Sequence, residues 1–119
     1  SDRIHVRTSK ENEKTSKHLI QLQLAITNYQ LMYLDYVSLQ NKQSQRDIEP
    51  FALVHTQENW ILIAFCRLRK DFRMFRLDCI QKLLNKVEDD PAFLLRRKMA
   101  IEANERQRTQ QPKGDNKTW

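Results

Sequence analysis

The sequence predicts an α+β domain in which one helix precedes a series of antiparallel strands and a second helix follows them. Apolar side chains recur at helical spacing in residues 17–31 and again in residues 92–103. Between these stretches lie four short segments that are rich in aromatic and β-branched residues and are separated by polar breaks. Helices placed before and after a run of hairpins are typical of the α+β class.

The first helix is expected to start near Thr15 or Ser16, either of which can act as its N-cap. Leu19 and Leu22 then fall on one apolar stripe. Residues 1–14 carry little apolar periodicity, so we expect them to form a linker.

The strands are expected where apolar and aromatic side chains alternate with polar ones. Pro50 cannot donate to a strand ladder, so it marks an edge, a bulge or the start of its strand. Residues 79–84 fit either a short strand or a helical turn, and the sequence leaves the two open. The four expected strands are residues 31–37, 47–56, 59–66 and 72–78.

A second helix is expected over residues 87–106, after which residues 107–119 form a disordered tail. Asp90 and Pro91 suit the N-cap and first helical position. The domain proper is therefore expected to span residues 15–86.

The charge balance favours an anionic partner, because Lys and Arg number 21 against 15 Asp and Glu, a formal charge of +6. No apolar run is long enough to span a membrane and no secretory signal is present, so we expect a cytoplasmic chain without a membrane partner. The first residue is Ser1 and not methionine, which indicates a fragment of a longer protein.

Neither catalysis nor a metal or other cofactor is expected. Cys66 and Cys79 lie in apolar surroundings without the CxxC spacing, and the three histidines are far apart in the sequence. A single glycine excludes a glycine-rich phosphate loop.

Arginine recurs at positions 67, 69, 73 and 76, among apolar residues that are needed for a core. One interpretation is that these side chains are the solvated positions of a half-exposed sheet. The other is a convergent cluster that binds phosphate or carboxylate oxygens, since a guanidinium offers a planar fork of donors. Alternation places Arg73 and Phe75 on one face of their strand and Phe72 and Arg76 on the other.

The stretch IEPFALVHTQENWILIAFCRLRKDFRMFRLDCIQKL resembles the WYL domain of bacterial transcriptional regulators, and the resemblance covers residues 17–84. Ile61 replaces the tyrosine of that family's motif and Cys79 replaces an arginine, and both changes weaken a ligand pocket while leaving the fold intact. The positions that match are Arg46, Pro50, Trp60, Leu62, Arg67 or Arg69, Arg73, Phe75, Arg76, Asp78 and Ile80.

The resemblance implies a small, strongly bent antiparallel β-barrel of the Sm-like or SH3-like kind with an N-terminal helix. It also implies a ligand-sensing domain that follows a helix-turn-helix DNA-binding domain in the whole regulator. The effector is expected to be a nucleotide, single-stranded DNA or RNA, bound through basic and aromatic residues. A module that forms a homodimer of the regulator and binds no small ligand is the alternative.

The expected ligand contacts differ in how well a structural role would explain them. Arg73 and Arg76 are the first candidates for ligand contacts, and the alternative is that they form structural salt bridges to Asp78 or Asp71. Phe65, Phe72 and Phe75 are expected in the core, not as platforms for stacked bases. Trp60 also fits a core position, and Tyr36 also fits a structural hydrogen bond. The full set of expected ligand-binding residues is Arg46, Arg67, Arg73, Arg76, Tyr36 and Trp60.

Overall fold

The computed structural model of the chain describes residues 9–110 and divides into two compact units, residues 1–87 and 88–119. The first unit holds one helix, five strands and a 3-10 turn; the second holds one helix. The elements are α1 (Ser9–Asn28), β1 (Met32–Val37), β2 (Gln43–His55), β3 (Trp60–Cys66), β4 (Asp71–Arg76), η1 (Leu77–Cys79), β5 (Ile80–Asn85) and α2 (Pro91–Gln110).

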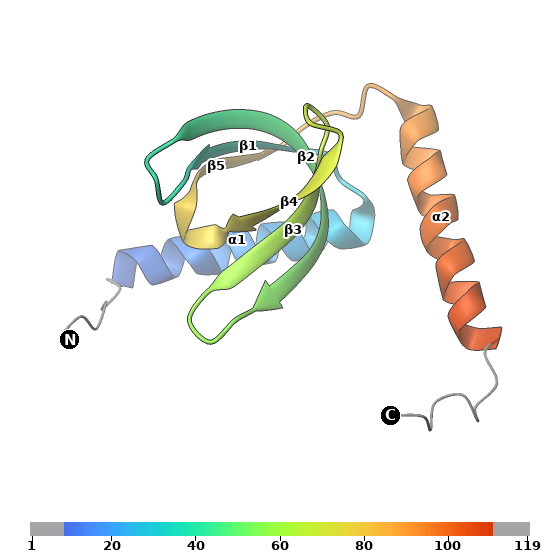
Figure 1. Ribbon diagram of the computed structural model, residues 1–119, viewed down its shortest axis with the longest axis horizontal. Coiled ribbons are helices and arrows are strands. Elements are labelled where there is room, and N and C mark those ends of the chain that lie inside the picture. The colour runs from blue at the N-terminus through green and yellow to red at the C-terminus, as the bar shows by residue number, and fades with distance from the viewer. Residues whose placement is uncertain (1–8, 111–119) are drawn as a thin grey trace. The chain divides into compact units, whose positions relative to one another are not determined.

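All neighbouring strands pair antiparallel in one five-stranded sheet with the order β4-β3-β2-β1-β5. The α+β class is therefore confirmed. Figure 1 shows the sheet curling strongly, with α1 running alongside the curl. The sheet does not close, because β4 and β5 are its two edges and are not paired with each other. A closed barrel is thus not confirmed; η1 follows β4 directly and turns Leu77 and Cys79 into the core before β5 begins.

The core lies between the inner side of the curled sheet and α1. Leu22 and Ala25 of α1 pack there with Leu34, Ile48 and other fully buried side chains of the strands. The buried positions of α1 are 15, 18, 22 and 25, a spacing that places them on one stripe of a helix. α1 therefore buries one stripe against β2 and η1, the elements that it contacts most.

Three elements differ from the sequence-based expectation. α1 begins at Ser9, inside the expected linker, and Thr15 is a buried residue of the helix interior and not its N-cap. β2 begins at Gln43, in a polar segment that was expected to be a loop. These polar residues form a strand because β1 pairs with them as far as its last residue, Val37, which lies opposite Gln43. Residues 79–84 combine both alternatives, since η1 ends at Cys79 and β5 follows.

Other local expectations are confirmed. The strand register shifts between Pro50 and Ala52, so Pro50 marks a β-bulge. In the second unit, Asp90 is the N-cap of α2, because its Oδ1 accepts a hydrogen bond from the Phe93 N–H at 3.2 Å. α2 continues to Gln110, and the remainder of the expected tail, like residues 1–8 of the expected linker, lies outside the described residues. Neither α1 nor α2 contains a stretch apolar enough to cross a membrane.

Candidate functional site

The curled sheet has a concave face toward the core and a convex face on the outside, and the arginines divide between them. Leu62, Ala64 and Cys66 of β3 have no exposed surface and define the concave face. Arg73 pairs with Ala64 across β3 and β4, so alternation places it on the concave face. Arg76 pairs with Ile61 and belongs to the convex face. The four arginines of the β3–β4 hairpin therefore do not form one cluster.

Arg46 of β2 extends over the concave face and is half-buried there. Its Nη1 donates to Cys66 Sγ at 3.6 Å, and its Cζ lies 5.6 Å from the centre of the Phe75 ring. Both contacts are weak, because sulfur is a poor acceptor and a cation–π contact contributes about 0.5–2 kcal/mol. The Nε atom of Arg46 is buried, and no residue in the described part of the chain accepts a hydrogen bond from it. Arg46 thus holds a partly desolvated guanidinium in place without a carboxylate partner.

Tyr36 joins the two sides of the opening in the curled sheet. Its ring meets the Phe75 ring edge to face, with centres 5.1 Å apart and planes at 79°. Its hydroxyl accepts a hydrogen bond of 2.9 Å from the backbone N–H of Arg76, so a side chain of β1 satisfies a backbone group of β4. Burial raises the pKa of Tyr36 to about 12, which keeps the phenol neutral. The predicted ligand residue Tyr36 therefore has a structural hydrogen bond in this structure.

Cys79, which replaces the motif arginine, is buried beside Tyr36. Burial raises the pKa of its thiol, and the nearby Asp78 charge raises it further. An uncharged thiol therefore stands beside Tyr36 and near Arg76, at the position where the resemblance to the family motif had led us to expect an arginine. This substitution leaves fewer positive charges to hold an anion.

We use the term concave-face site for Tyr36, Arg46, Cys66, Arg73 and Phe75. Arg73 is exposed, and residues 9–110 provide no ion pair or hydrogen bond for its side chain. It lies two residues from Phe75 on the same face of β4. The site therefore offers one fixed and one free guanidinium beside an aromatic ring.

Arg67 and Arg76 are bound to carboxylates within the domain. Arg67 Nε lies 2.9 Å from Glu49 Oε2, and Glu49 is buried. Arg76 forms a bidentate pair with Asp78, with distances of 3.0 Å from Nε and 2.7 Å from Nη2, and this pairing raises the pKa of Arg76. Its Nη2 also donates to Asn59 Oδ1 at 3.0 Å. For Arg76, the structure therefore has the salt bridge to Asp78 that was the alternative to ligand binding.

Trp60 lies at the start of β3. It is half-buried against the core, and its ring centre is 4.7 Å from that of His55. Cys66 is six residues further along β3, which corresponds to about 20 Å at the rise of a strand. Trp60 therefore lies at the opposite end of β3 from Cys66, but only two residues from Leu62, which pairs with Phe75.

Two features were missed by sequence reasoning. Phe75 is buried as expected, but Phe72 is 53% exposed on the convex face, where its ring meets those of Phe51 and Phe65 at 5.6 and 5.4 Å. The strand register determines this grouping, and the bulge after Pro50 brings Phe51 into it. The sequence alone gives no signal for such a bulge beyond the proline itself.

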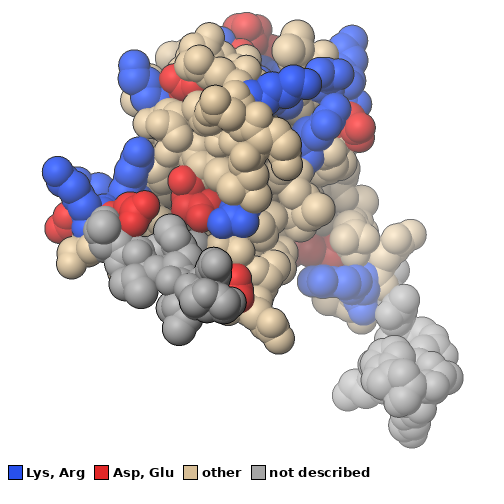
Figure 2. Space-filling model, turned by 60° about the vertical axis from the view of Figure 1, so that its left-hand side comes forward, with Lys and Arg blue, Asp and Glu red and all other residues tan. Residues whose placement is uncertain are grey.

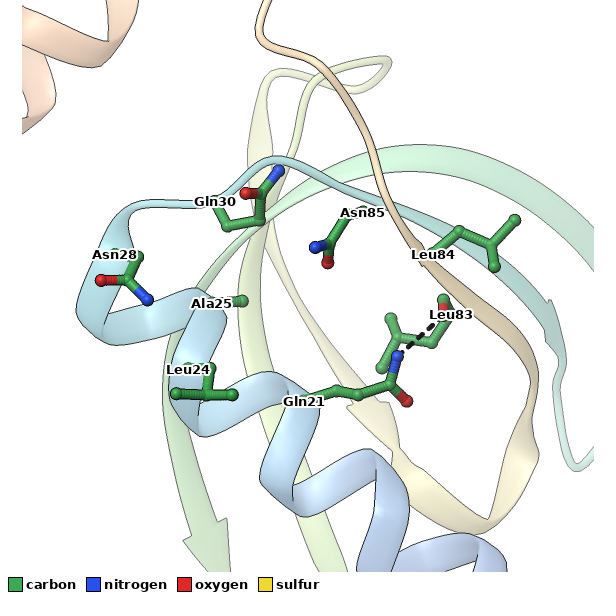
Figure 3. A pocket seen from close by; sticks show the side chains of 8 residues that line it. All are labelled: Gln21, Leu24, Ala25, Asn28, Gln30, Leu83, Leu84 and Asn85. Atoms are coloured by element: carbon green, nitrogen blue, oxygen red, sulfur yellow. Dashed lines mark hydrogen bonds between the residues drawn. The ribbon is translucent and has the colours of Figure 1, made fainter.

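The second feature is a cleft of about 450 Å³ between α1 and β5. Gln21 Nε2 donates to the Leu83 carbonyl at 3.2 Å across it, as Figure 3 shows. No charged side chain lines this cleft, so it does not match an anionic ligand. No group of three metal-ligating side chains occurs within residues 9–110. The residues that line the cleft are Gln21, Leu24, Ala25, Asn28, Gln30, Leu83, Leu84 and Asn85.

Comparison with known proteins gives matches to the first unit. The uncharacterized HTH-type transcriptional regulator YobV of Bacillus subtilis (strain 168) is 33% identical over 73 residues, which cover 61% of this chain and 23% of that protein. The solved structure of proteasome accessory factor B/C (PafBC) of Arthrobacter aurescens has a TM-score of 0.60 at 24% identity, covering 71% of this chain and 13% of that one. The chain therefore spans less than a quarter of the length of either relative. The family model of the WYL domain matches residues 17–84, most of the first unit, and the chain belongs to the WYL domain family.

Proposed function

We propose that this chain is the effector-sensing regulatory domain of a bacterial transcriptional regulator, and that the concave-face site binds an anionic effector. The effector class is a nucleotide or a short single-stranded nucleic acid. Membership of the WYL domain family and the similarity to a helix-turn-helix regulator support the regulatory role. The chain itself supplies no catalytic group in this proposal.

The state of Arg46 is the observation that carries the proposal. A buried polar group without a partner costs about 1–3 kcal/mol. Among the described residues His18 Nδ1 and Asp35 Oδ1 are also buried without a partner, and Arg46 is the arginine in this group. Arg67 and Arg76 each have a carboxylate at hydrogen-bonding distance, whereas Arg46 has only a thiol and a ring. A bound phosphate would supply the strong acceptor that Arg46 lacks.

Arg73 adds a second cation at the same face, and its exposure lets it meet a ligand that approaches from solvent. Phe75 fixes the Arg46 guanidinium by its ring, which reduces the side-chain entropy that binding has to remove. Neutral Cys79 and Ile61 limit the number of contacts. We therefore expect weak binding that depends strongly on salt.

Fluorescence anisotropy with a labelled oligothymidine of about six nucleotides tests the proposal on the full chain. If two phosphates are neutralised, raising the salt from about 50 to 200 mM should weaken binding about sevenfold. Arg46→Gln should weaken binding at low salt by about 10- to 150-fold, the loss of one charge-assisted hydrogen bond. Arg76→Gln is the matched control, because its guanidinium already pairs with Asp78.

Equal loss in the two variants, with both folded, would show that binding depends on overall charge and not on the concave-face site. Absence of binding to the oligonucleotide and to nucleotides at low salt, combined with a stable dimer in sedimentation, would support the dimerisation module instead. Unchanged binding in Arg46→Gln would reject the proposed site directly.

A further inference from the structure

We propose that the free edge of β4 docks an extended peptide of a protein partner, in which apolar and acidic residues alternate. This surface shares Arg73 with the concave-face site but does not include Arg46. It combines unpaired backbone groups, an exposed apolar patch on one side and free cations on the other. Each of these three features sets one requirement for the partner.

The backbone of β4 is available for pairing at Phe72 and Met74. β4 is an edge strand, and the Arg76 N–H points away from β3 because it donates to Tyr36. Backbone groups alternate sides along a strand, so the N–H and C=O of Phe72 and Met74 also point to the free edge. No residue among those described pairs with them. An added strand could therefore form up to about four backbone hydrogen bonds, as in β-strand addition.

The two edges of the sheet differ in this respect. At β5, Gln21 of α1 donates to the Leu83 carbonyl, so a side chain covers part of that edge. At β4 the Tyr36 hydroxyl covers the N–H of Arg76, the last residue of the strand, and no side chain among the described residues bonds to the backbone of Phe72 or Met74. Natural proteins usually cover, charge or bend their edge strands. The edge of β4 is charged but not covered at Phe72 and Met74, so it can pair with a strand that carries the opposite charge.

An apolar patch flanks this edge on the convex face. Met74 is 73% exposed, Phe72 53% and Phe51 47%, and Phe65 lies half-buried between them. Ile63 pairs with Met74 and extends the patch onto β3. We call these five residues the convex patch. Partner side chains on this side of an added strand would bury apolar surface against Phe72 and Met74.

Cations lie along the same edge. Arg69, Lys70 and Arg73 are exposed, and the segment has Asp71 as its acidic residue. Figure 2 shows lysine and arginine side chains on the upper part of one face, with some acidic side chains among them and further basic groups at the left and lower right. Arg73 points to the concave face, so partner residues on that side of an added strand would meet a positive charge. Acidic residues therefore fit at every second position, and apolar residues between them.

A second copy of this chain fits less well. Antiparallel pairing that uses both Phe72 and Met74 would place Arg73 of the two copies directly opposite each other, and like charges in that position destabilise a strand pair. A single-stranded nucleic acid would use the cations but not the backbone groups. The rings of Phe51 and Phe65 also meet Phe72 at 72° and 77°, which presents ring edges as well as ring faces. The peptide is the partner that uses all three features.

Isothermal titration with an acetylated and amidated peptide of alternating valine and glutamate tests the proposal on the full chain. The control peptide has the same composition with the valines and glutamates in separate blocks. A third peptide carries N-methyl groups at alternate positions, which removes pairing donors without changing charge. We expect the alternating peptide to bind and both others to lose at least about tenfold in affinity, the equivalent of one net hydrogen bond.

Two variants place the binding on β4. Met74→Pro removes an edge N–H but leaves the ladder to β3 intact, and Phe72→Ser removes apolar surface. Both should lose peptide binding by at least about tenfold. Val54→Ser is the matched control, since Val54 is a 43% exposed apolar residue of β2 outside the convex patch. Arg46→Gln should retain peptide binding, which separates this proposal from the effector site.

Three outcomes would overturn the proposal. One is equal affinity for the alternating and block peptides, since charge alone would then explain binding. Another is that the chain binds an oligothymidine but no peptide, and that Phe72→Ser loses this oligothymidine binding. The last is that the wild-type chain binds no peptide but forms a dimer in sedimentation, and that Met74→Pro converts this dimer to a monomer.

Discussion

Replacement of Arg46 by methionine tests whether Arg46 is kept for ligand binding or for the scaffold, because the two roles predict opposite changes in the free energy of unfolding. Methionine has a similar length and fills the space beside Phe75 without a charge. Removing the buried, unpaired Nε should recover about 1–3 kcal/mol, and losing the cation–π contact to Phe75 should cost about 0.5–2 kcal/mol. The free energy of unfolding should therefore rise by about 1 kcal/mol.

Urea and thermal denaturation followed by circular dichroism measure this change. For a domain of this size, a gain of about 1 kcal/mol should raise Tm by about 4–8 °C. Arg76→Met is the matched control and should lower the free energy of unfolding, because it leaves Asp78 without its bidentate partner. A decrease of more than about 1 kcal/mol in the free energy of unfolding of Arg46→Met would show that Arg46 is part of the scaffold and not a ligand-binding residue.

Further predictions concern the scaffold around the concave-face site. Arg76→Gln should lower the free energy of unfolding by about 0.5–1 kcal/mol and leave effector affinity unchanged, and an unaltered Tm would show that its pair with Asp78 contributes nothing. Tyr36→Phe should cost about 1–2 kcal/mol, because the Arg76 N–H loses its acceptor. Because folding raises the pKa of Tyr36 to about 12, the wild type should keep its full stability below about pH 10 and lose stability as pH rises toward 12. Denaturation across this range should show no such loss for Tyr36→Phe. Burial, with a smaller effect of Lys14, lowers the pKa of His18, so stability should fall below about pH 6.5 in the wild type and less in His18→Gln. A chelator should leave Tm unchanged, and stoichiometric zinc in elemental analysis would contradict the interpretation of the cysteines.

Much of the fold follows from local sequence signals. Each expected strand occurs within a few residues, and Asp90 and Pro91 start α2 as their chemistry predicts. The misses lie where tertiary contacts decide. Polar residues 43–45 form strand because β1 offers them a partner, and Thr15 is helical because the stripe of α1 buries it. The periodicity of the sequence does not indicate the pairing of residues 43–45 with β1 or the burial of Thr15.

The candidate site was harder to predict than the fold. Alternation alone correctly separates Arg73 from Arg76, but it cannot show which arginine has an acid nearby. Asp78 follows Arg76 by two residues, so that pair was foreseeable, whereas Glu49 reaches Arg67 only through the β2–β3 pairing. The contact of Arg46 with Phe75 depends on the curl of the whole sheet. Local sequence patterns do not encode such long-range geometry.

The central claim is that the effector binds at Arg46 on the concave face. Two-dimensional NMR of the full chain, with the Arg46 Nε–H resonance assigned through Arg46→Gln, tests it during titration with a 5′-phosphorylated oligothymidine. We expect the largest shift changes at Arg46 Nε–H and at the backbone amides of Arg73 and Phe75, and we expect the changes at these two amides to disappear in Arg46→Gln. Shift changes confined to Phe51 and Phe72 on the convex face, or to α2, with Arg46 Nε–H unmoved, would contradict it.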